Sequence, residues 1–324
     1  FITDFNPDGF SGDVKAYGLG TDGQFLSTPS ASANAALLAA GASRQVITDD
    51  GGAGLNFTWG VGISATLTPA YVQALVGATQ ATTAAQNGFA EQLMAYMRGG
   101  NNSGGGVFRP RGEDKVLGPI VNSAPWLQDT QSAALYTDAD FPAGTASYRA
   151  YTLSKATRDS VLWVGANDGM LHGFKASDLT PVLSYVPSAL VSRLAGALSV
   201  TNTSAVSLMD GSPFTGDVLV LPGTGFKTEA TTATSTKSTW RTYLFSSLGR
   251  GGRAVFALDV TSPASLRDAT QAASAFKWVF SSRNDSDMGY QLLDPVRHSA
   301  SGEPSAIVHI NSGDFGLLVP NGYG

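Results

Sequence analysis

Residues Val161–Asp178, VLWVGANDGMLHGFKASD, carry the pattern that decides the fold. An apolar run, Val161–Val164, precedes the turn-forming residues Asn167–Gly169, and a second apolar run follows before a polar corner at Ser177. Two short apolar runs separated by Asn, Asp and Gly are typical of a β-hairpin. The stretch therefore predicts two strands joined by a tight turn.

The hairpin is one copy of a repeat, because the same form recurs in Ser11–Leu19 (SGDVKAYGL) and Gly251–Pro263 (GGRAVFALDVTSP). Each copy has Gly, an apolar residue, a small residue before an aromatic residue or Leu, and then a polar corner. The copies are too far apart for a plain array of roughly 40-residue blades, so we expect additional strands or insertions between them. A repeat of short strands favours a β-propeller.

Composition supports an all-β fold with helical insertions. Hydrophobic residues make up 43% of the 324 residues, which is enough for a large core, whereas charged residues make up only 14%. The 38 glycines and the many Ser, Thr and Ala residues suit short strands and turns better than long surface helices. Capped helices are nevertheless predicted after Thr68 and from Ser188.

Charge and cysteine content exclude several classes of function. The net charge is −5 and no cluster of Lys or Arg occurs, so nucleic acid is not expected as a partner. The chain has no cysteine, which excludes disulfides, zinc-thiolate sites and iron-sulfur sites. No apolar run approaches the roughly 18 to 20 residues that a membrane-spanning helix needs, so no transmembrane segment is predicted.

A segment rich in Gly and Asn, Arg98–Asp114, has the composition of a linker and predicts a boundary near residue 115. We expect residues 1–115 to hold the first blade strands, a helical segment and this linker, and residues 116–324 to hold propeller blades. The residues LLVPNGYG, Leu317–Gly324, match the first strand and turn of another copy. We therefore expect an incomplete propeller, with the chain ending inside a repeat, and an upstream part removed before Phe1.

Nine motifs together resemble one known family. In order they are FSGDVKAY, YMRGG, LGPIVNSAPW, WVGANDGMLHGF, SYVPSAL, MDGSPF, LGRGGRAVFALDVTSP, MGYQLLDP and VPNGYG. They resemble the PilC/PilY proteins of type IV pilus biogenesis, which include tip adhesins, through their C-terminal β-propeller domain. The similarity covers nearly the whole chain. It departs from the family pattern at Pro119, where Asp is frequent, and at Pro320, where Gly is frequent.

The resemblance implies a modified β-propeller with quinoprotein-like blades, in a bacterial protein that is exported to the pilus tip, the cell surface or the outer membrane. It implies promotion of pilus assembly, opposition to retraction and attachment to surfaces. Minor pilins and the pilus tip are the implied partners, with a host surface or glycans as further ligands. The family's Asp-rich calcium loop is expected after the NGYG segment, and no such spacing occurs in these 324 residues. Calcium is therefore implied for the parent protein and is not supported within this chain.

The residues themselves offer no catalytic or cofactor-binding set. Asn284, Asp285 and Asp287 bring together oxygen side chains, which hard cations prefer, but no further acidic residue follows to complete a coordination shell. This pattern favours a solvated turn whose side chains bond their own backbone, with a weak cation site as the alternative. The 3 histidines are too scattered for a metal motif or an activated nucleophile, so His172 is predicted to be a packed, hydrogen-bonded structural residue.

Three functions remain open. The first is a noncatalytic pilus assembly factor and adhesin whose irregular loops, such as Asp129–Ser147 and Gly225–Thr239, meet partners or host surfaces. The second is a quinone-dependent dehydrogenase, because those enzymes are also propellers, although a similar fold alone is weak support for shared chemistry. The third is a glycan-binding propeller module. The resemblance favours the first function.

Overall fold

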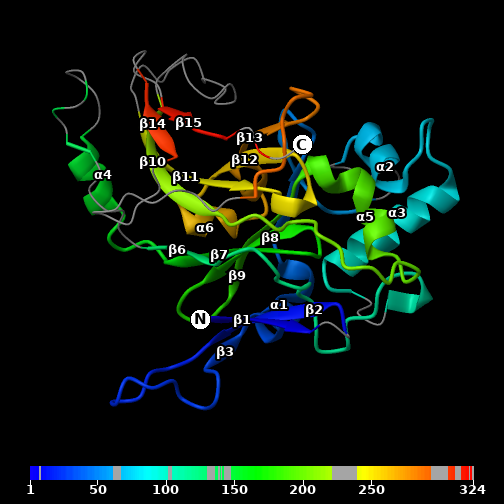
Figure 1. Cartoon of the computed structure of the whole chain (residues 1–324), viewed down its shortest axis with the longest axis horizontal. Coiled ribbons are helices and arrows are strands. Elements are labelled where there is room, and N and C mark those ends of the chain that lie inside the picture. The colour runs from blue at the N-terminus through cyan, green and yellow to red at the C-terminus, as the bar shows by residue number, and fades with distance from the viewer. Residues whose placement is uncertain are drawn as a thin grey trace.

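The computed structural model describes residues 1–6, 9–60, 67–100, 104–129, 136–137, 139, 141, 147–220, 239–292, 306–310, 315–320 and 322. Strands predominate among these residues and a few helices are inserted between them (Figure 1), which confirms the predicted all-β class with helical insertions. Within the described residues, the strands pair into sheets of six, four, three and two strands. The loops Asp129–Ser147 and Gly225–Thr239 lie mostly outside the described residues.

The hairpin that decided the fold is present. Strand β7 (Val161–Ala166) pairs antiparallel with β8 (Met170–Lys175), and Gly169 in the turn has φ of 92°, a conformation that favours glycine. Strand β9 (Pro181–Val186) continues the meander, and β4 (Val46–Asp49) pairs with β9 in parallel. This parallel pairing joins two segments far apart in the sequence.

The second sheet is a four-stranded antiparallel meander, the form of a propeller blade. It consists of β10 (Phe214–Val220), β11 (Thr239–Ser247), β12 (Ala254–Asp259) and β13 (Phe276–Ser281). The repeat copy GGRAVFALDVTSP supplies β12 and the corner after it. The expected form of the repeat, a strand followed by a polar corner, is therefore present here too.

The two larger sheets pack against each other (Figure 1). The ring of Tyr185 in β9 lies edge-on to that of Phe256 in β12, with 4.8 Å between the ring centroids. At the neighbouring edge, Trp126 Nε1 donates to Thr215 Oγ1 in β10 at 2.9 Å. These aromatic contacts and hydrogen bonds hold the two sheets in place relative to each other.

The N-terminal residues form a smaller sheet. The predicted first hairpin is β1 (Ile2–Asn6) with β2 (Ser11–Ala16), to which β3 (Ala31–Ser32) is added before helix α1 (Ala33–Ala40). Ser32 caps α1 by accepting a hydrogen bond from the N–H of Ala35. The sheet and α1 lie at one end of the molecule in Figure 1.

Residues on both sides of position 115 share one hydrophobic cluster. Val14 and Leu37 pack there with Leu117 and Val164. The described part of the Gly-rich segment is also packed into the fold, because Phe108 and Arg111 are only 2% exposed. The boundary near residue 115 stays a prediction from the composition of the sequence. In the structure, residues before and after this position pack together.

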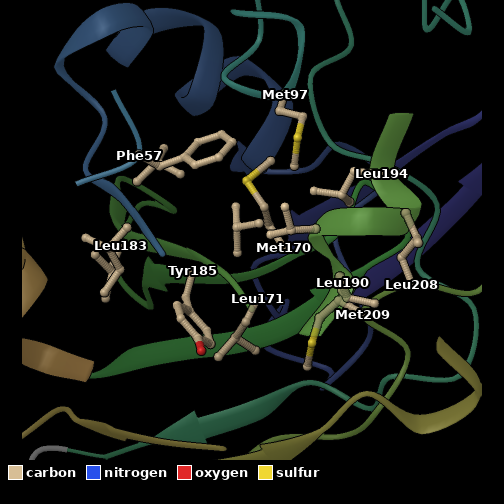
Figure 2. Packing of buried hydrophobic residues seen from close by; sticks show 14 of the residues in the cluster. Phe57, Met97, Met170, Leu171, Leu183, Tyr185, Leu190, Leu194, Leu208 and Met209 are labelled. Carbon is tan, nitrogen blue, oxygen red and sulfur yellow. The ribbon is translucent and has the colours of Figure 1, made fainter. Parts of the chain in front are cut away.

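Helices α2 (Pro69–Val76), α3 (Ala84–Met97) and α5 (Val191–Leu198) gather on one side of the sheets in Figure 1. Thr68 caps α2 as predicted, and Pro69 occupies the first turn. The helices cover the largest core cluster, part of which Figure 2 shows around Met170, Tyr185 and Leu194.

The remaining elements are shorter and connect these units. No helix among the described residues is long and apolar enough to cross a membrane. The other strands and helices are β5 (Gly54–Asn56), β6 (Trp126–Gln128), β14 (Ile307–His309), β15 (Phe315–Leu317), α4 (Tyr148–Ser154), α6 (Pro263–Leu266), η1 (Gly41–Ser43), η2 (Gly104–Gly106), η4 (Ser188–Leu190), η5 (Gly249–Gly251) and η6 (Ala272–Ala275).

Candidate functional site

The predicted weak cation candidates lie in the turn after β13. Asn284 Oδ1 accepts the backbone N–H of Ser281 at 2.9 Å, and Asp285 Oδ1 accepts the backbone N–H of Asp287 at 3.0 Å. These side chains therefore bond local backbone, which is the pattern of an Asx turn. Among the described residues, no group of three or more His, Cys, Asp or Glu side chains could hold a metal ion. The described residues do not fit a calcium site, and a weak cation site at this turn stays a prediction.

The same turn borders a cleft that the sequence did not indicate. Asp285 and Asp287 lie at a hollow of about 600 Å³ beside β12, β13 and β15. Phe280 in β13 lines it and is 42% exposed, and Gln291 lines it while almost fully buried. The other lining residues are mainly apolar, namely Val255, Trp278, Met288, Leu317, Val319 and Pro320. A hollow with apolar walls and a carboxylate rim can contact a ligand or a partner protein.

A hydrogen-bonded Ser–His–Asp row lies within the six-stranded sheet. Nδ1 of His172 in β8 lies 3.0 Å from Ser184 Oγ in β9, and Nε2 lies 3.1 Å from Asp168 Oδ2 in the hairpin turn. The sheet register sets this contact, because His172 is paired with Ser184 across β8 and β9. The residue types are those of a serine hydrolase triad, so access to the hydroxyl decides what the row can do.

Burial rules out substrate access to this hydroxyl. Ser184 is 2% exposed, Asp168 1% and His172 0%. Ser184 Oγ also accepts a hydrogen bond from Arg44 Nη2 at 3.1 Å, so a buried guanidinium occupies the approach to the oxygen. The row is therefore structural, and the predicted packed, hydrogen-bonded role of His172 is confirmed.

Electrostatics show how the fold tolerates these buried charges. Burial by itself raises the pKa of Asp168, but the charge and hydrogen bond of His172, Arg111 and the N–H of Gly118 together lower it. Burial lowers the pKa of Arg44 to about 10, and Arg44 Nη1 donates to the carbonyl of Arg98 at 3.0 Å. Asp168 and Arg44 thus attract each other and each makes hydrogen bonds, which buried charges need, although Nε of Arg44 has no hydrogen-bond partner among the described residues.

Sequence reasoning missed most of this network. No local pattern marks Ser184 or Arg44, because these two residues bond each other across a separation of 140 residues in the sequence. The predicted candidates Asp285 and Asp287 do lie at a cleft. Asn284 is not among the residues that line it.

Comparison with known proteins extends the sequence resemblance. The family model described as the PilY1 beta-propeller domain matches residues 117–324. A Type IV pilus biogenesis factor PilY1 homolog of Xylella fastidiosa (strain Temecula1 / ATCC 700964) is 31% identical over 234 residues, covering 71% of this chain and 16% of that protein. Type IV pilus biogenesis factor PilY1 of Pseudomonas aeruginosa (strain UCBPP-PA14) is 28% identical over 236 residues, covering 72% of this chain and 17% of that protein.

A solved structure is also similar in sequence. The crystal structure of the Pseudomonas aeruginosa PilY1 C-terminal domain aligns with 55% of this chain and 28% of that chain, with 27% identity and a TM-score of 0.36. The chain spans only about a sixth of the length of these curated relatives, 16% and 17%. Because the family model covers residues 117–324, most of the chain, this protein belongs to the PilY1 beta-propeller domain family.

Proposed function

We propose that this chain is part of a noncatalytic type IV pilus assembly factor that also acts as a tip-associated adhesin. The observation that carries the proposal is the match of residues 117–324 to the PilY1 beta-propeller domain. The names of the relatives, type IV pilus biogenesis factors, support the assembly role. In this proposal the parent protein is exported and works at the pilus tip, the cell surface or the outer membrane.

The described side chains support a noncatalytic role. The Ser–His–Asp row at Asp168, His172 and Ser184 is sealed from solvent, so it offers no nucleophile to a substrate. A quinone-dependent dehydrogenase would need calcium ligands and a catalytic carboxylate that converge. Nothing in the described residues favours that alternative, and the protein is not proposed to be an enzyme.

Binding is therefore the proposed mode of action. A packed propeller core holds irregular loops and surface hollows in fixed positions, and such features are where binding residues concentrate. The cleft beside Asp285 and Asp287 is one surface available to a partner. Minor pilins and other pilus-tip components are the proposed partners, with a host surface or glycans as further ligands. Calcium remains a proposal for the parent protein.

The proposal is tested by counting surface pili in the source bacterium after deletion of the parent gene, with attachment measured in parallel. We expect loss of pili and attachment, and partial return of pili when the retraction motor is also disabled. Complementation with the parent gene should restore both. Normal pili and attachment in both deletion strains would refute the pilus role. Dye-coupled alcohol oxidation with added quinone and calcium would then be assayed.

A further inference from the structure

The cleft bordered by Asp285 and Asp287 can hold more than a single small group. Its volume of about 600 Å³ lies within the roughly 300 to 1,000 Å³ that is typical of ligand sites. Phe280 and Val319 line it and are 42% and 38% exposed, and Leu318, the neighbour of Val319, is 59% exposed. Apolar surface therefore continues from the cleft onto the outside of the chain. Such a surface next to a hollow indicates an interaction site.

The charges at this cleft have one sign. Among the described residues that line it, Asp285 and Asp287 are acidic and none is Lys, Arg or His. Neither carboxylate makes an ion pair with another described residue. Arg253 extends to the same turn, but its Nη1 donates to the backbone carbonyl of Ser286 at 3.4 Å. The rim of the cleft is therefore negative.

A buried acceptor at the same cleft also lacks a donor. Gln291 lines the cleft and is only 6% exposed. Its Oε1 is buried and has no hydrogen-bond partner in the part of the chain that the structure describes. Its Nε2 already donates to the carbonyl of Gly289 at 3.2 Å. A buried acceptor without a donor costs free energy, so an N–H group that a ligand brings to this oxygen is favoured.

These features together discriminate between ligands. An anion would meet like charge at Asp285 and Asp287. A neutral apolar molecule would fill the hollow but leave both carboxylates and the Gln291 oxygen without partners. A metal ion would leave the apolar walls uncovered, and no described group of acidic residues is large enough to hold one. A peptide segment with a cation beside a large apolar residue can satisfy the apolar walls, the carboxylates and the buried oxygen.

We propose that this cleft docks a segment of a partner protein in which Lys or Arg lies within two residues of a large apolar side chain. The apolar side chain fills the hollow beside Phe280, and the cation lies at the rim near Asp285 and Asp287. As a description of how a pilus partner is recognised, the inference rests on the binding role proposed above. The preference of the cleft is tested on the purified chain, so its failure and the failure of the pilus role are distinguishable.

The test uses the 324-residue chain and follows the methyl signal of Met288, which lines the cleft, by NMR. The probe is the peptide acetyl-Leu-Arg-Arg-Leu-amide, and Met94 in helix α3 reports on the core outside the cleft. We expect a saturable shift of the Met288 signal and no shift of the Met94 signal. The absence of a Met288 shift would overturn the proposal.

Two matched peptides separate the contributions of charge and apolar surface. Acetyl-Leu-Gln-Gln-Leu-amide, which lacks the cations, should bind about three- to tenfold more weakly. Acetyl-Ala-Arg-Arg-Ala-amide, which lacks the large apolar side chains, should also bind more weakly. Added NaCl should weaken the binding of the Leu-Arg peptide and leave that of the Leu-Gln peptide nearly unchanged. Equal affinities of the three peptides would overturn the proposal.

Charge variants locate the binding at the rim. Asp285→Asn and Asp287→Asn combined should weaken the binding of the Leu-Arg peptide about threefold or more, without effect on the Leu-Gln peptide. The control is Asp22→Asn, because Asp22 is also exposed and its Oδ1 accepts the N–H of Gln24 at 3.0 Å, as Asp285 does with the N–H of Asp287. It should have no effect. Equal affinities in the combined variant and the control would contradict the role of the carboxylates.

An apolar variant tests the wall of the cleft. Phe280→Ala should weaken the binding of both Leu-containing peptides about fivefold, whereas Phe25→Ala, at another exposed ring, should not. Circular dichroism checks the fold of each variant, and sedimentation measures the oligomeric state. A chain that is dimeric in solution and becomes monomeric with Phe280→Ala would assign the cleft to a second copy of this chain and overturn the proposal.

Discussion

Nε2 of His172 lies 3.1 Å from Oδ2 of Asp168, and both side chains are almost completely buried. The same Asp168 oxygen accepts the backbone N–H of Gly118 at 2.9 Å, and Oδ1 accepts that of Met170 at 3.1 Å. One carboxylate thus joins the hairpin turn, strand β8 and the segment that follows residue 115. Asp168, His172 and Ser184 are the residue types of a catalytic triad, but here they are buried and connect parts of the sheet. An enzyme would leave its nucleophile accessible to substrate.

Replacement of Asp168 by Asn should strongly destabilise the fold. Asn keeps the size of the side chain but removes the charge that faces His172, and loss of one partner of a buried pair costs about 3 to 5 kcal/mol. The free energy of unfolding is measured with urea at neutral pH. The control is Asp159→Asn, which breaks an exposed ion pair with Lys175 and should change stability by less than about 1 kcal/mol. Equal stability of the two variants would contradict the structural role of Asp168.

The contribution of Asp168 should also depend on pH. Its pKa is lower in the folded chain than its ordinary value, so the folded state favours the carboxylate. A group with a lowered pKa stabilises the fold above its unfolded pKa, and this contribution is lost as the pH falls through the folded pKa. The stability difference between the natural chain and Asp168→Asn should therefore shrink below about pH 4. A difference that stays constant between pH 7 and pH 3 would refute this assignment.

The hairpin around Asp168 was predictable because its signals are local. Apolar runs on both sides of Asn167–Gly169 indicate strand, turn and strand without reference to any other part of the chain. The pairing of β4 with β9 was not predictable in this way, since Val46–Asp49 and Pro181–Val186 lie far apart in the sequence and meet only in the folded chain. The Asx turn at Asn284 is local and was predicted, whereas the cleft beside it needs β15 to be folded against β12 and β13.

Gly173 should not tolerate a methyl group. A Cβ at this position would lie 2.4 Å from the ring of Trp163, which is fully buried and cannot move aside. Overpacking of this kind costs about 1 to 3 kcal/mol. Gly173→Ala should therefore lower the midpoint of urea unfolding.

The matched control for this substitution is Gly196→Ala. Gly196 lies in α5, where an added Cβ meets nothing within 4 Å. Alanine is favoured over glycine in a helix by about 0.8 to 1 kcal/mol, so Gly196→Ala should raise the midpoint. A fall in the midpoint of similar size in both variants would show that the contact with Trp163 is not the reason why Gly173→Ala is destabilising.

Asn34 should be needed to hold residues 116 and 117 against the N-terminal sheet. Its Oδ1 accepts the backbone N–H groups of Val116 at 2.8 Å and of Leu117 at 2.9 Å, while its Nδ2 donates to the carbonyl of Gly12. Asn34→Ala leaves two buried donors without acceptors, at a cost of about 1 to 3 kcal/mol each. We expect lower stability and faster hydrogen exchange at the amides of Val116 and Leu117, measured by NMR.

The control for Asn34 is Asn202→Ala. Asn202 Nδ2 donates to carbonyls at the end of α5 at 3.3 and 3.5 Å, and its Oδ1 accepts the N–H of Ser204 at 3.0 Å, but these bonds are exposed or only partly buried, so water can replace them. This substitution should change stability by less than about 1 kcal/mol and leave exchange at Val116 and Leu117 unaltered. Faster exchange confined to these amides in Asn34→Ala would show that one side chain ties the two parts of the chain across residue 115. Unchanged exchange would mean that packing of Leu117 in its hydrophobic cluster is sufficient to hold the segment.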